Sequence, residues 1–277
     1  MKAIWWYSAL FVLMVVGVTW LVFPGPRELA TIYSQDNKID KAMAMLTDQL
    51  AKSPDDPDLN QSMAGLLYDA GRVDQAIAYL ERVLALRPER VDQLLRLADW
   101  REGLYQTAEV VKDLEAALKR LPPADVRKPE SVVLRRDLLI RLLDIYIYQD
   151  DAEAQYATVL RLLPLDAVVR AGIVAGCAPL RSAVAELKRM ADASRDQAAD
   201  PVFRENFLEA YGLCRMLADD IVDDQGGPAR EATFLADLME LLVRGEMQDA
   251  AARIAQAADA GTGGVTARLA LARTFSS

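Results

Sequence analysis

The sequence predicts an all-α protein in which a single N-terminal transmembrane helix precedes a solenoid of helix–turn–helix repeats. Three observations support this fold class. A long apolar stretch without charge opens the chain, and several residue types then recur at a fixed interval of 34 residues. Nowhere do apolar and polar residues alternate with period two over a useful length, which argues against strands.

The apolar stretch runs from Ala3 to Phe23 and is followed by a Pro-Gly-Pro break. A helix of this length spans the hydrocarbon core of a bilayer. Trp5 and Trp6 lie at one end of the stretch and Trp20 at the other, as expected for aromatic residues at the two membrane interfaces. We therefore assign residues 1–25 to an anchor. Two alternatives are a cleaved signal peptide, whose apolar region is usually shorter, and a buried helix of a soluble domain.

The repeats are marked by Pro54, Pro88 and Pro122, which stand 34 residues apart. This is the length of one helix–turn–helix unit. Further positions keep the same register over three repeats, namely Leu29, Met63 and Leu97; Ala30, Ala64 and Ala98; Leu46, Leu80 and Leu114; and Leu50, Leu84 and Leu118. Small residues allow two helices to approach closely, while the leucines are buried within and between pairs, so one repeat cannot form a core alone.

The stretch "NQSMAGLLYDAGRVDQAIAYLERVLALRP" resembles the tetratricopeptide repeat family, with Ala64, Gly71, Ala76 and Pro88 at the small, turn and stop positions of that family. We expect Gly71 to end the first helix of the pair with a positive φ. Asp74 should lie in the first turn of the second helix, where its charge favours the helix dipole, and Pro88 should end the pair.

The pattern is less regular after the third repeat. We predict three repeats over residues 26–124, an elongated fourth repeat over 125–165, an irregular helical segment over 166–225, and a C-terminal repeat-like pair with a capping helix over 226–277. Pro164 should close the fourth repeat, and Pro179 should lie near the start of a helix. In the last pair, Gly245 is predicted at a turn, Ala250 and Ala257 at small packing positions, and Leu269–Phe275 as the capping helix.

Composition argues against catalysis, and we expect no enzyme activity, no cofactor and no metal ion. The 277 residues include no histidine, which removes the usual general base and the commonest metal ligand. No glycine-rich phosphate-binding pattern is present. A net charge of −9 argues against nucleic acid as a partner. Cys177 and Cys214 are expected to be buried thiols, with a disulfide between them as the alternative in an oxidising compartment.

One segment suggests an alternative, enzymatic function. "FLEAYGLCRMLADDIVDD" (Phe207–Asp224) is similar to the first aspartate-rich helix of squalene and phytoene synthases. That resemblance implies a Mg²⁺-dependent prenyl-diphosphate enzyme in which Asp219, Asp220 and Asp223 of the Asp219–Asp224 motif bind the ions. Those families need a second aspartate-rich helix far downstream, which the remaining sequence lacks. The other interpretation is an acidic, solvated helix face.

The family resemblance also implies a concave groove that is lined by the first helix of each pair. Its protein-binding positions fall on Arg27, Thr31 and Ser34 in the first repeat, on Asp58, Gln61, Gly65, Tyr68 and Asp69 in the second, on Asp92, Leu95, Asp99 and Glu102 in the third, and on Asp137, Arg141 and Asp144 beyond it. The row is mostly acidic and differs from the family variant that clamps a peptide's terminal carboxylate. A solvated acidic surface without a ligand is the alternative.

Together these features predict a membrane-tethered scaffold that binds protein partners or peptide segments, as an accessory factor of an envelope assembly or export system. A purely structural assembly role would use another surface of the same array. Lys2 lies on one side of the apolar stretch and Arg27, Lys38 and Lys41 on the other, so the charge rule for orientation is nearly balanced. We expect a single-pass protein of the bacterial inner membrane with the array in the periplasm.

Overall fold

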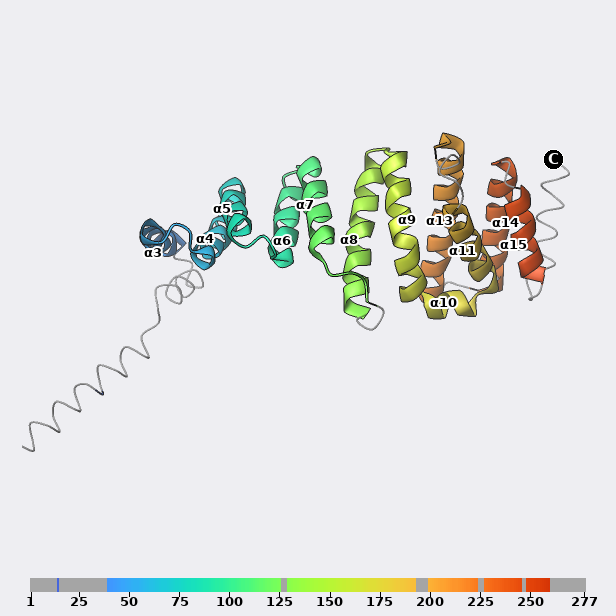
Figure 1. The fold of residues 1–277 in the computed structure, drawn as a ribbon, viewed down its shortest axis with the longest axis horizontal. Coiled ribbons are helices and arrows are strands. Elements are labelled where there is room, and N and C mark those ends of the chain that lie inside the picture. Colours follow the sequence, from blue (N-terminus) through green and yellow to red (C-terminus); the bar gives the residue numbers. More distant parts are fainter. Residues whose placement is uncertain are drawn as a thin grey trace, which may run out of the picture. The chain divides into compact units, whose positions relative to one another are not determined.

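In the computed structural model, Met14 and residues 39–125, 129–192, 199–223, 227–245 and 248–259 are described. All regular structure in these ranges is α-helical (Figure 1). The helices are α3 (Ile39–Lys52), α4 (Pro57–Asp69), α5 (Val73–Leu86), α6 (Val91–Glu102), α7 (Thr107–Arg120), α8 (Pro129–Tyr148), α9 (Ala152–Val169), α10 (Ala171–Gly176), α11 (Ala178–Ala191), α13 (Pro201–Val222), α14 (Pro228–Arg244) and α15 (Gln248–Asp259).

The chain divides into two compact units, Met1–Arg120 and Leu121–Ser277. In the first unit, α4 packs against α5, α6 packs against α7, and α3 packs against α4. The prolines lie where the sequence places them, because α3, α5 and α7 each end before Pro54, Pro88 and Pro122 respectively. The 34-residue interval is therefore the spacing of successive helix pairs in this unit.

The pair α4–α5 shows how local signals set its helix ends. Asp56 caps α4 by accepting hydrogen bonds from the backbone N–H groups of Asp58 and Leu59, at 2.9 and 3.1 Å. Gly71 follows α4 with φ +74°, as predicted, and Asp74 lies in the first turn of α5. These signals confirm the predicted turn between the two helices.

The same turn recurs in two further pairs with other residues at the left-handed position. Tyr105 has φ 58° between α6 and α7, and Asp150 has φ 55° between α8 and α9. In all three turns, the residue after the left-handed position donates its backbone N–H to the carbonyl oxygen five residues earlier. These hydrogen bonds run from Arg72 to Leu67 at 2.8 Å, from Gln106 to Arg101 at 3.0 Å, and from Asp151 to Tyr146 at 3.0 Å. This is the hydrogen bond that closes a Schellman-type helix end. Only the glycine was recognisable in the sequence.

The core of the first unit consists of the recurring small and aliphatic residues. Ala64, Ala76 and Ala98 are at most 1% exposed, which confirms the close approach of helices at these positions. The leucines at positions 46, 80 and 114 are completely buried, and Met63, Leu97 and Leu118 are less than 5% exposed. Leu50 and Leu84 are partly buried. Leu29 and Ala30 lie outside the described residues.

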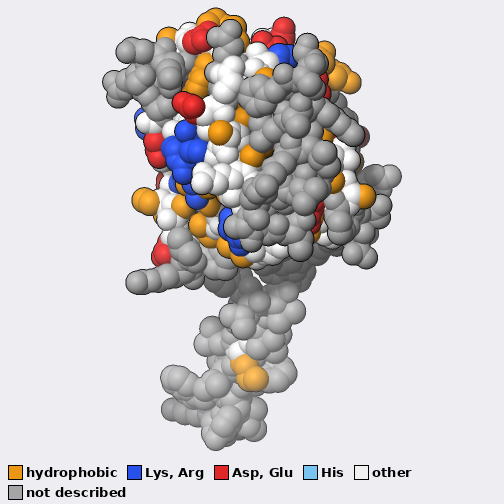
Figure 2. All heavy atoms as spheres, turned by 90° about the vertical axis from the view of Figure 1, so that its right-hand side faces the viewer, with side chains coloured by type: hydrophobic (Ala, Val, Ile, Leu, Met, Phe, Trp, Pro, Cys, Tyr) orange, Lys and Arg blue, Asp and Glu red, His pale blue; other side chains and the backbone are white. Residues whose placement is uncertain are grey.

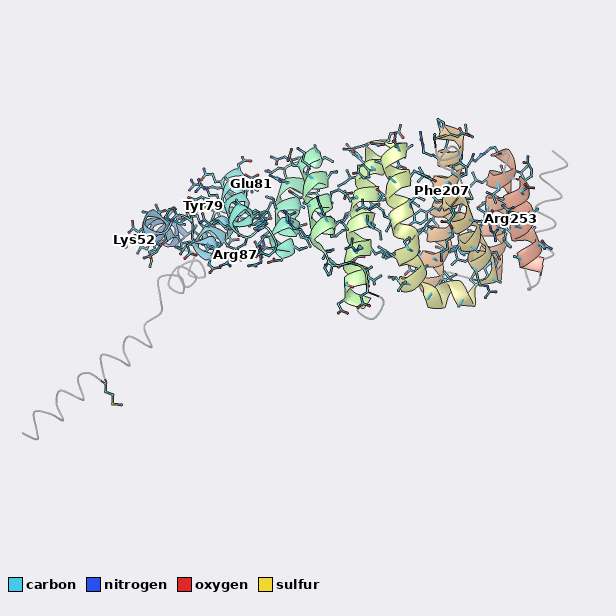
Figure 3. All side chains as sticks on the ribbon, in the orientation of Figure 1. Lys52, Tyr79, Glu81, Arg87, Phe207 and Arg253 are labelled. Carbon is cyan, nitrogen blue, oxygen red and sulfur yellow. The ribbon has the colours of Figure 1, made fainter. Side chains whose placement is uncertain are left out.

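A buried ion pair joins three helices of this unit. The guanidinium of Arg101 on α6 donates to both carboxylate oxygens of Asp113 on α7, at 2.8 and 2.7 Å, and to Glu81 on α5. Figure 3 marks Glu81 on α5. Burial raises the pKa of Asp113, although the hydrogen bonds from Arg101 oppose this shift. The pair fixes the register of α6 against its neighbours, because a lone buried charge is costly.

In the second unit, α8 and α9 form a long antiparallel pair, and the prediction that Pro164 closes the fourth repeat is wrong. Pro164 lies inside α9, which continues to Val169. Its own side chain is exposed, whereas Leu162, Leu163 and Leu165 around it are buried. Packing of these leucines outweighs the cost of a proline inside a helix, which is about 3 kcal/mol.

The remaining helices pack around α11 and α13. Residues 166–200 contain α10 and α11, with Pro179 in the first turn of α11, and α13 contacts α9, α11 and α14. Helix α15 packs on α11 and α14, and Arg253 of α15 donates to the buried carboxylate of Glu186 on α11, at 3.0 Å (Figure 3). The end of this unit that carries α14 and α15 exposes basic, acidic and apolar side chains beside one another (Figure 2).

The C-terminal pair agrees with the sequence at two of three positions. Gly245 follows α14, at a place where an added Cβ would lie 2.5 Å from the Nδ2 atom of Asn206 on α13. Ala250 is buried as predicted. The prediction for Ala257 is wrong, because this residue is exposed. The predicted capping helix Leu269–Phe275 lies outside the described residues.

The predicted anchor, residues 1–25, also lies outside the described residues except for Met14. Among the helices that the structure describes, none is both long enough and apolar enough to cross a bilayer.

Replacing Ala98 by leucine should overpack the first unit, because the alanine is completely buried. We expect the free energy of unfolding to fall by about 1–3 kcal/mol. Urea unfolding followed by circular dichroism measures this loss. Ala85→Leu is the matched control, since Ala85 is exposed on α5 and the same substitution there should be nearly neutral. Equal stability of the two variants would contradict the assigned packing.

Candidate functional site

An aromatic pair marks the candidate groove face in the first unit. The rings of Tyr68 on α4 and Trp100 on α6 are stacked, with centroids 4.7 Å apart and planes inclined by 11°. Trp100 is 7% exposed and Tyr68 is 44% exposed. Tyr68 therefore covers the indole and keeps part of its own surface in solvent. Sequence reasoning identified Tyr68 and missed Trp100, although their separation of 32 residues is close to one repeat.

Gly65 lies next to Tyr68 on the same face of α4. Gln61, Gly65 and Tyr68 are spaced by four and three residues, which places them in one row along a helix. Apart from the neighbouring residues and backbone of α4 itself, no atom lies within 4 Å of a Cβ built at Gly65, so the space above it is open. The row thus combines a half-exposed aromatic ring with an open stretch of helix surface.

Two acidic residues of the predicted groove have arginine partners that the sequence did not indicate. Asp58 pairs with Arg87 at 3.0 Å. Arg90 donates to both oxygens of Asp92, at 2.8 and 2.6 Å, and these bonds hold the pKa of that carboxyl well below its usual range. Both arginines come from the loop between α5 and α6. Two of the predicted acidic charges are therefore partly neutralised.

The other predicted groove residues are distributed over both units. Asp69, Asp99 and Glu102 are exposed in the first unit, and Leu95 is partly buried there. Asp137 and Asp144 are exposed and Arg141 is partly buried on α8, in the second unit. The positions of the first repeat, Arg27, Thr31 and Ser34, lie outside the described residues.

A separate pocket lies within the second unit, where sequence reasoning found no site. It lies among α9, α10, α11 and α13 and has a volume of about 30 Å³. Aliphatic side chains form much of its wall, namely Leu163, Val174, Leu180, Val184 and Leu187. Asp166, Arg170, Tyr211 and Arg215 add polar groups.

The polar groups at this pocket form two sets of hydrogen bonds and ion pairs. The hydroxyl of Tyr211 donates to one oxygen of Asp166, at 2.8 Å, and Nε of Arg136 donates to the other, at 2.6 Å. Burial, followed by the charge of Asp166, raises the pKa of Tyr211, which stays protonated. In the second set, Arg170 pairs with Asp219 and also donates to the backbone carbonyl of Arg215, at 3.3 Å.

The aspartates of the alternative, enzymatic interpretation have arginine partners from different helices. Asp219 pairs with Arg170, while Asp220 accepts a hydrogen bond from Arg230 on α14. Asp223 is exposed and follows α13, and Asp224 lies outside the described residues. Within the described ranges, no three residues of the metal-binding types form a cluster. The carboxylates of Asp219 and Asp220 thus tie α13 to the end of α9 and to α14.

Cys177 and Cys214 are thiols and both are buried, at the start of α11 and within α13. Burial raises the pKa of Cys214 to about 12 and also raises that of Cys177. Both side chains are therefore neutral at physiological pH, and Cys214 adds no negative charge to the wall of the pocket.

Comparison with known proteins gives a family for part of the chain. Residues 33–98 match the family described as tetratricopeptide repeat. No curated protein sequence matches the chain. A solved structure titled "Functional Characterization of Pseudomonas Aeruginosa pilF" is similar over 91% of this chain and 95% of that one, with 15% identity and a TM-score of 0.35. A likeness this weak carries no conclusion about function. Residues 33–98, which contain α3 to α5 and most of α6, are thus similar to tetratricopeptide repeats.

Proposed function

We propose that the chain is a membrane-tethered scaffold that recruits a protein partner through the face formed by Gln61, Gly65 and Tyr68 on α4. The observation that carries the proposal is the stack of Tyr68 on Trp100 beside the open surface at Gly65. Tyr68 and Gly65 lie within the stretch that matches tetratricopeptide repeats, which ends at residue 98. Repeats of this family supply surfaces for protein recognition, and this is the part of the chain that resembles them.

The geometry suits an anchor residue of an interface. Stacking on a buried indole restricts the ring of Tyr68 before any partner arrives, so less side-chain entropy is lost on binding. Tyrosine and tryptophan are also enriched among the residues that contribute most to binding energy. The glycine adjacent to this ring leaves room for a partner's backbone or a bulky side chain.

Charge on the same unit favours a basic or polar segment as the ligand. Asp69, Asp92, Asp99 and Glu102 are exposed there. Exposed charges act mainly on the rate of encounter and on specificity. We expect the acidic charge of this unit to contribute to encounter and specificity.

The apolar stretch Ala3–Phe23 supports a tether in the membrane. A tether holds a scaffold near membrane-embedded partners at high effective concentration, so that weak contacts suffice. An accessory role in an envelope assembly or export system, with the array in the periplasm of a bacterium, fits this arrangement.

Crosslinking from the groove face tests the recruitment. A photoreactive residue at position 61 should capture a partner in intact cells, and mass spectrometry identifies it. Tyr68→Ala should reduce this product about fivefold to thirtyfold, because the loss of an anchoring aromatic costs about 1–2 kcal/mol. Tyr105→Ala is the control, since Tyr105 is 91% exposed in the turn after α6. Equal capture by all three forms would exclude the face on α4.

Gly65→Ala separates binding from stability at the same site. Nothing lies near the added methyl group, and alanine avoids the cost of glycine inside a helix, so the free energy of unfolding should rise by about 0.5–1 kcal/mol. Partner capture should fall, because the methyl group occupies the open surface. Gly212→Ala on α13 is the control, as its surroundings are equally open and it should raise stability without affecting capture. Unchanged partner capture by the Gly65→Ala variant would show that Gly65 is not part of the interface.

The orientation of the tether can be tested with reporters fused after Ser277. Alkaline phosphatase, which is active only outside the cytoplasm, should be active in this fusion. A fluorescent protein that folds only in the cytoplasm should stay dark at the same position. Fluorescence without phosphatase activity would reverse the proposed orientation, and recovery of the fusion in the soluble fraction would contradict the tether.

A further inference from the structure

The two cysteines of the chain lie on helices of the second unit that pack against one another. Cys177 stands at the junction of α10 and α11, and Cys214 lies within α13. Both α10 and α11 contact α13 (Figure 1). The two cysteines are 4% and 5% exposed. The fold therefore brings two thiols from different helices into one part of the core.

The two thiols are also close to one another. Burial raises the pKa of Cys214 to about 12, and the charge that Cys177 carries when ionised raises it further. Such an effect weakens with distance, so the two sulfur atoms are near neighbours. A cavity of about 30 Å³ adjoins Cys214, Val174 and Leu180, and the last two stand three residues before and after Cys177. This cavity gives the side chain of Cys214 room to move toward Cys177.

Helix α10 is the element of this region that opens most easily. None of its six residues is buried, and Gly172 and Gly176 lower its helix propensity. A segment with so few buried contacts has low local stability. Cys177 directly follows α10, and its backbone N–H donates to the carbonyl of Ile173, at 3.1 Å. Opening of α10 therefore releases Cys177, whereas Cys214 lies inside the 22 residues of α13.

We propose that Cys177 and Cys214 form a disulfide within the chain when it meets a disulfide oxidant such as oxidised glutathione, and that this bond fits the native packing of α13. Cys177 reacts first. The site lies in a different unit from the face on α4, so it does not depend on partner recruitment. Nor does the reaction with a purified chain depend on the side of the membrane that the array faces.

The exchange takes place in two steps. The Cys177 thiol loses its proton and its sulfur attacks one sulfur of the oxidant, whose S–S bond breaks and whose other half leaves as a thiolate that takes up a proton. The Cys214 thiol then loses its proton and attacks the sulfur of Cys177, which releases the second half of the oxidant as a thiol. Two electrons thus pass from the two cysteines to the oxidant.

Mass spectrometry of the full chain tests the proposal. The chain is incubated in detergent micelles with oxidised glutathione, unfolded with a maleimide present, and digested with trypsin from the monomer band of a non-reducing gel. We expect the peptides of residues 171–181 and 205–215 to be joined, with no maleimide on either cysteine. Maleimide on both cysteines, a bond only between two chains, or glutathione that stays on Cys177 would overturn the proposal.

Thermal unfolding measures whether the bond fits the native packing. A disulfide restricts the unfolded chain, so the oxidised form should unfold at a temperature about 5–10 °C higher than the reduced form. Circular dichroism gives the midpoints. Cys177→Ala and Cys214→Ala are the controls, because a buried free cysteine behaves as a small apolar residue and the oxidant should not shift their midpoints upward. A midpoint of the parent chain that does not rise on oxidation would contradict the proposed fit.

The single variants also test the order of the two steps. Cys214→Ala should retain one glutathione on Cys177, whereas Cys177→Ala should react about tenfold more slowly, because Cys214 becomes accessible only through a larger opening. Equal rates for the two variants would overturn the assigned order.

Gly172→Ala tests α10 as the route of access. Alanine favours the helix, so oxidation of the parent sequence with this change should slow about twofold to fivefold. Gly212→Ala on α13 is the matched control, since its surroundings are equally open and it should leave the rate unchanged. An equal effect of the two substitutions would exclude the opening of α10 as the route to Cys177.

Discussion

The close approach of helices at small residues is the constraint on which the rest of the first unit depends. Ala64, Ala76 and Ala98 are fully or almost fully buried, and their small side chains allow two helices to approach closely. Larger residues of the neighbouring positions can then fill the space on either side. Each helix pair has similar helix lengths, the same type of turn and a proline after its second helix. As a result, the alanine contact forms again in the next pair.

This repeated constraint explains why the first unit could be predicted from sequence. At each recurring position, a proline, alanine or leucine has the same physical role in every repeat. Three copies of the repeat are therefore enough to recognise that role. Pro164 shows the limit of such reasoning, because a proline ends a helix only where packing does not outweigh its cost. Tyr68 and Gly65 were identified through the groove positions that the family resemblance implies. Trp100, Arg87 and Arg90 were not, since these residues reach the face from the next pair or from a loop.

The pocket of the second unit could not be predicted, because its residues share no motif and come together only through the packing of four helices. Asp219 illustrates the difficulty. Its spacing to Asp220 and Asp223 along one helix suggested a metal ligand, yet its partner Arg170 is 49 residues away in the chain. Local spacing on one helix cannot reveal a partner that lies on another. Long-range ion pairs are therefore the part of this site that required three-dimensional information.

The left-handed residue of each turn affects how the sequence of such a chain can evolve. Glycine, tyrosine and aspartate occupy this position in three helix pairs, and the same backbone hydrogen bond closes each turn. The geometry thus tolerates different side chains, at a cost of about 1–2 kcal/mol for residues other than glycine. All three residues are exposed. These turns are sites at which new surface chemistry can arise by single substitutions while the helix pairs keep their packing.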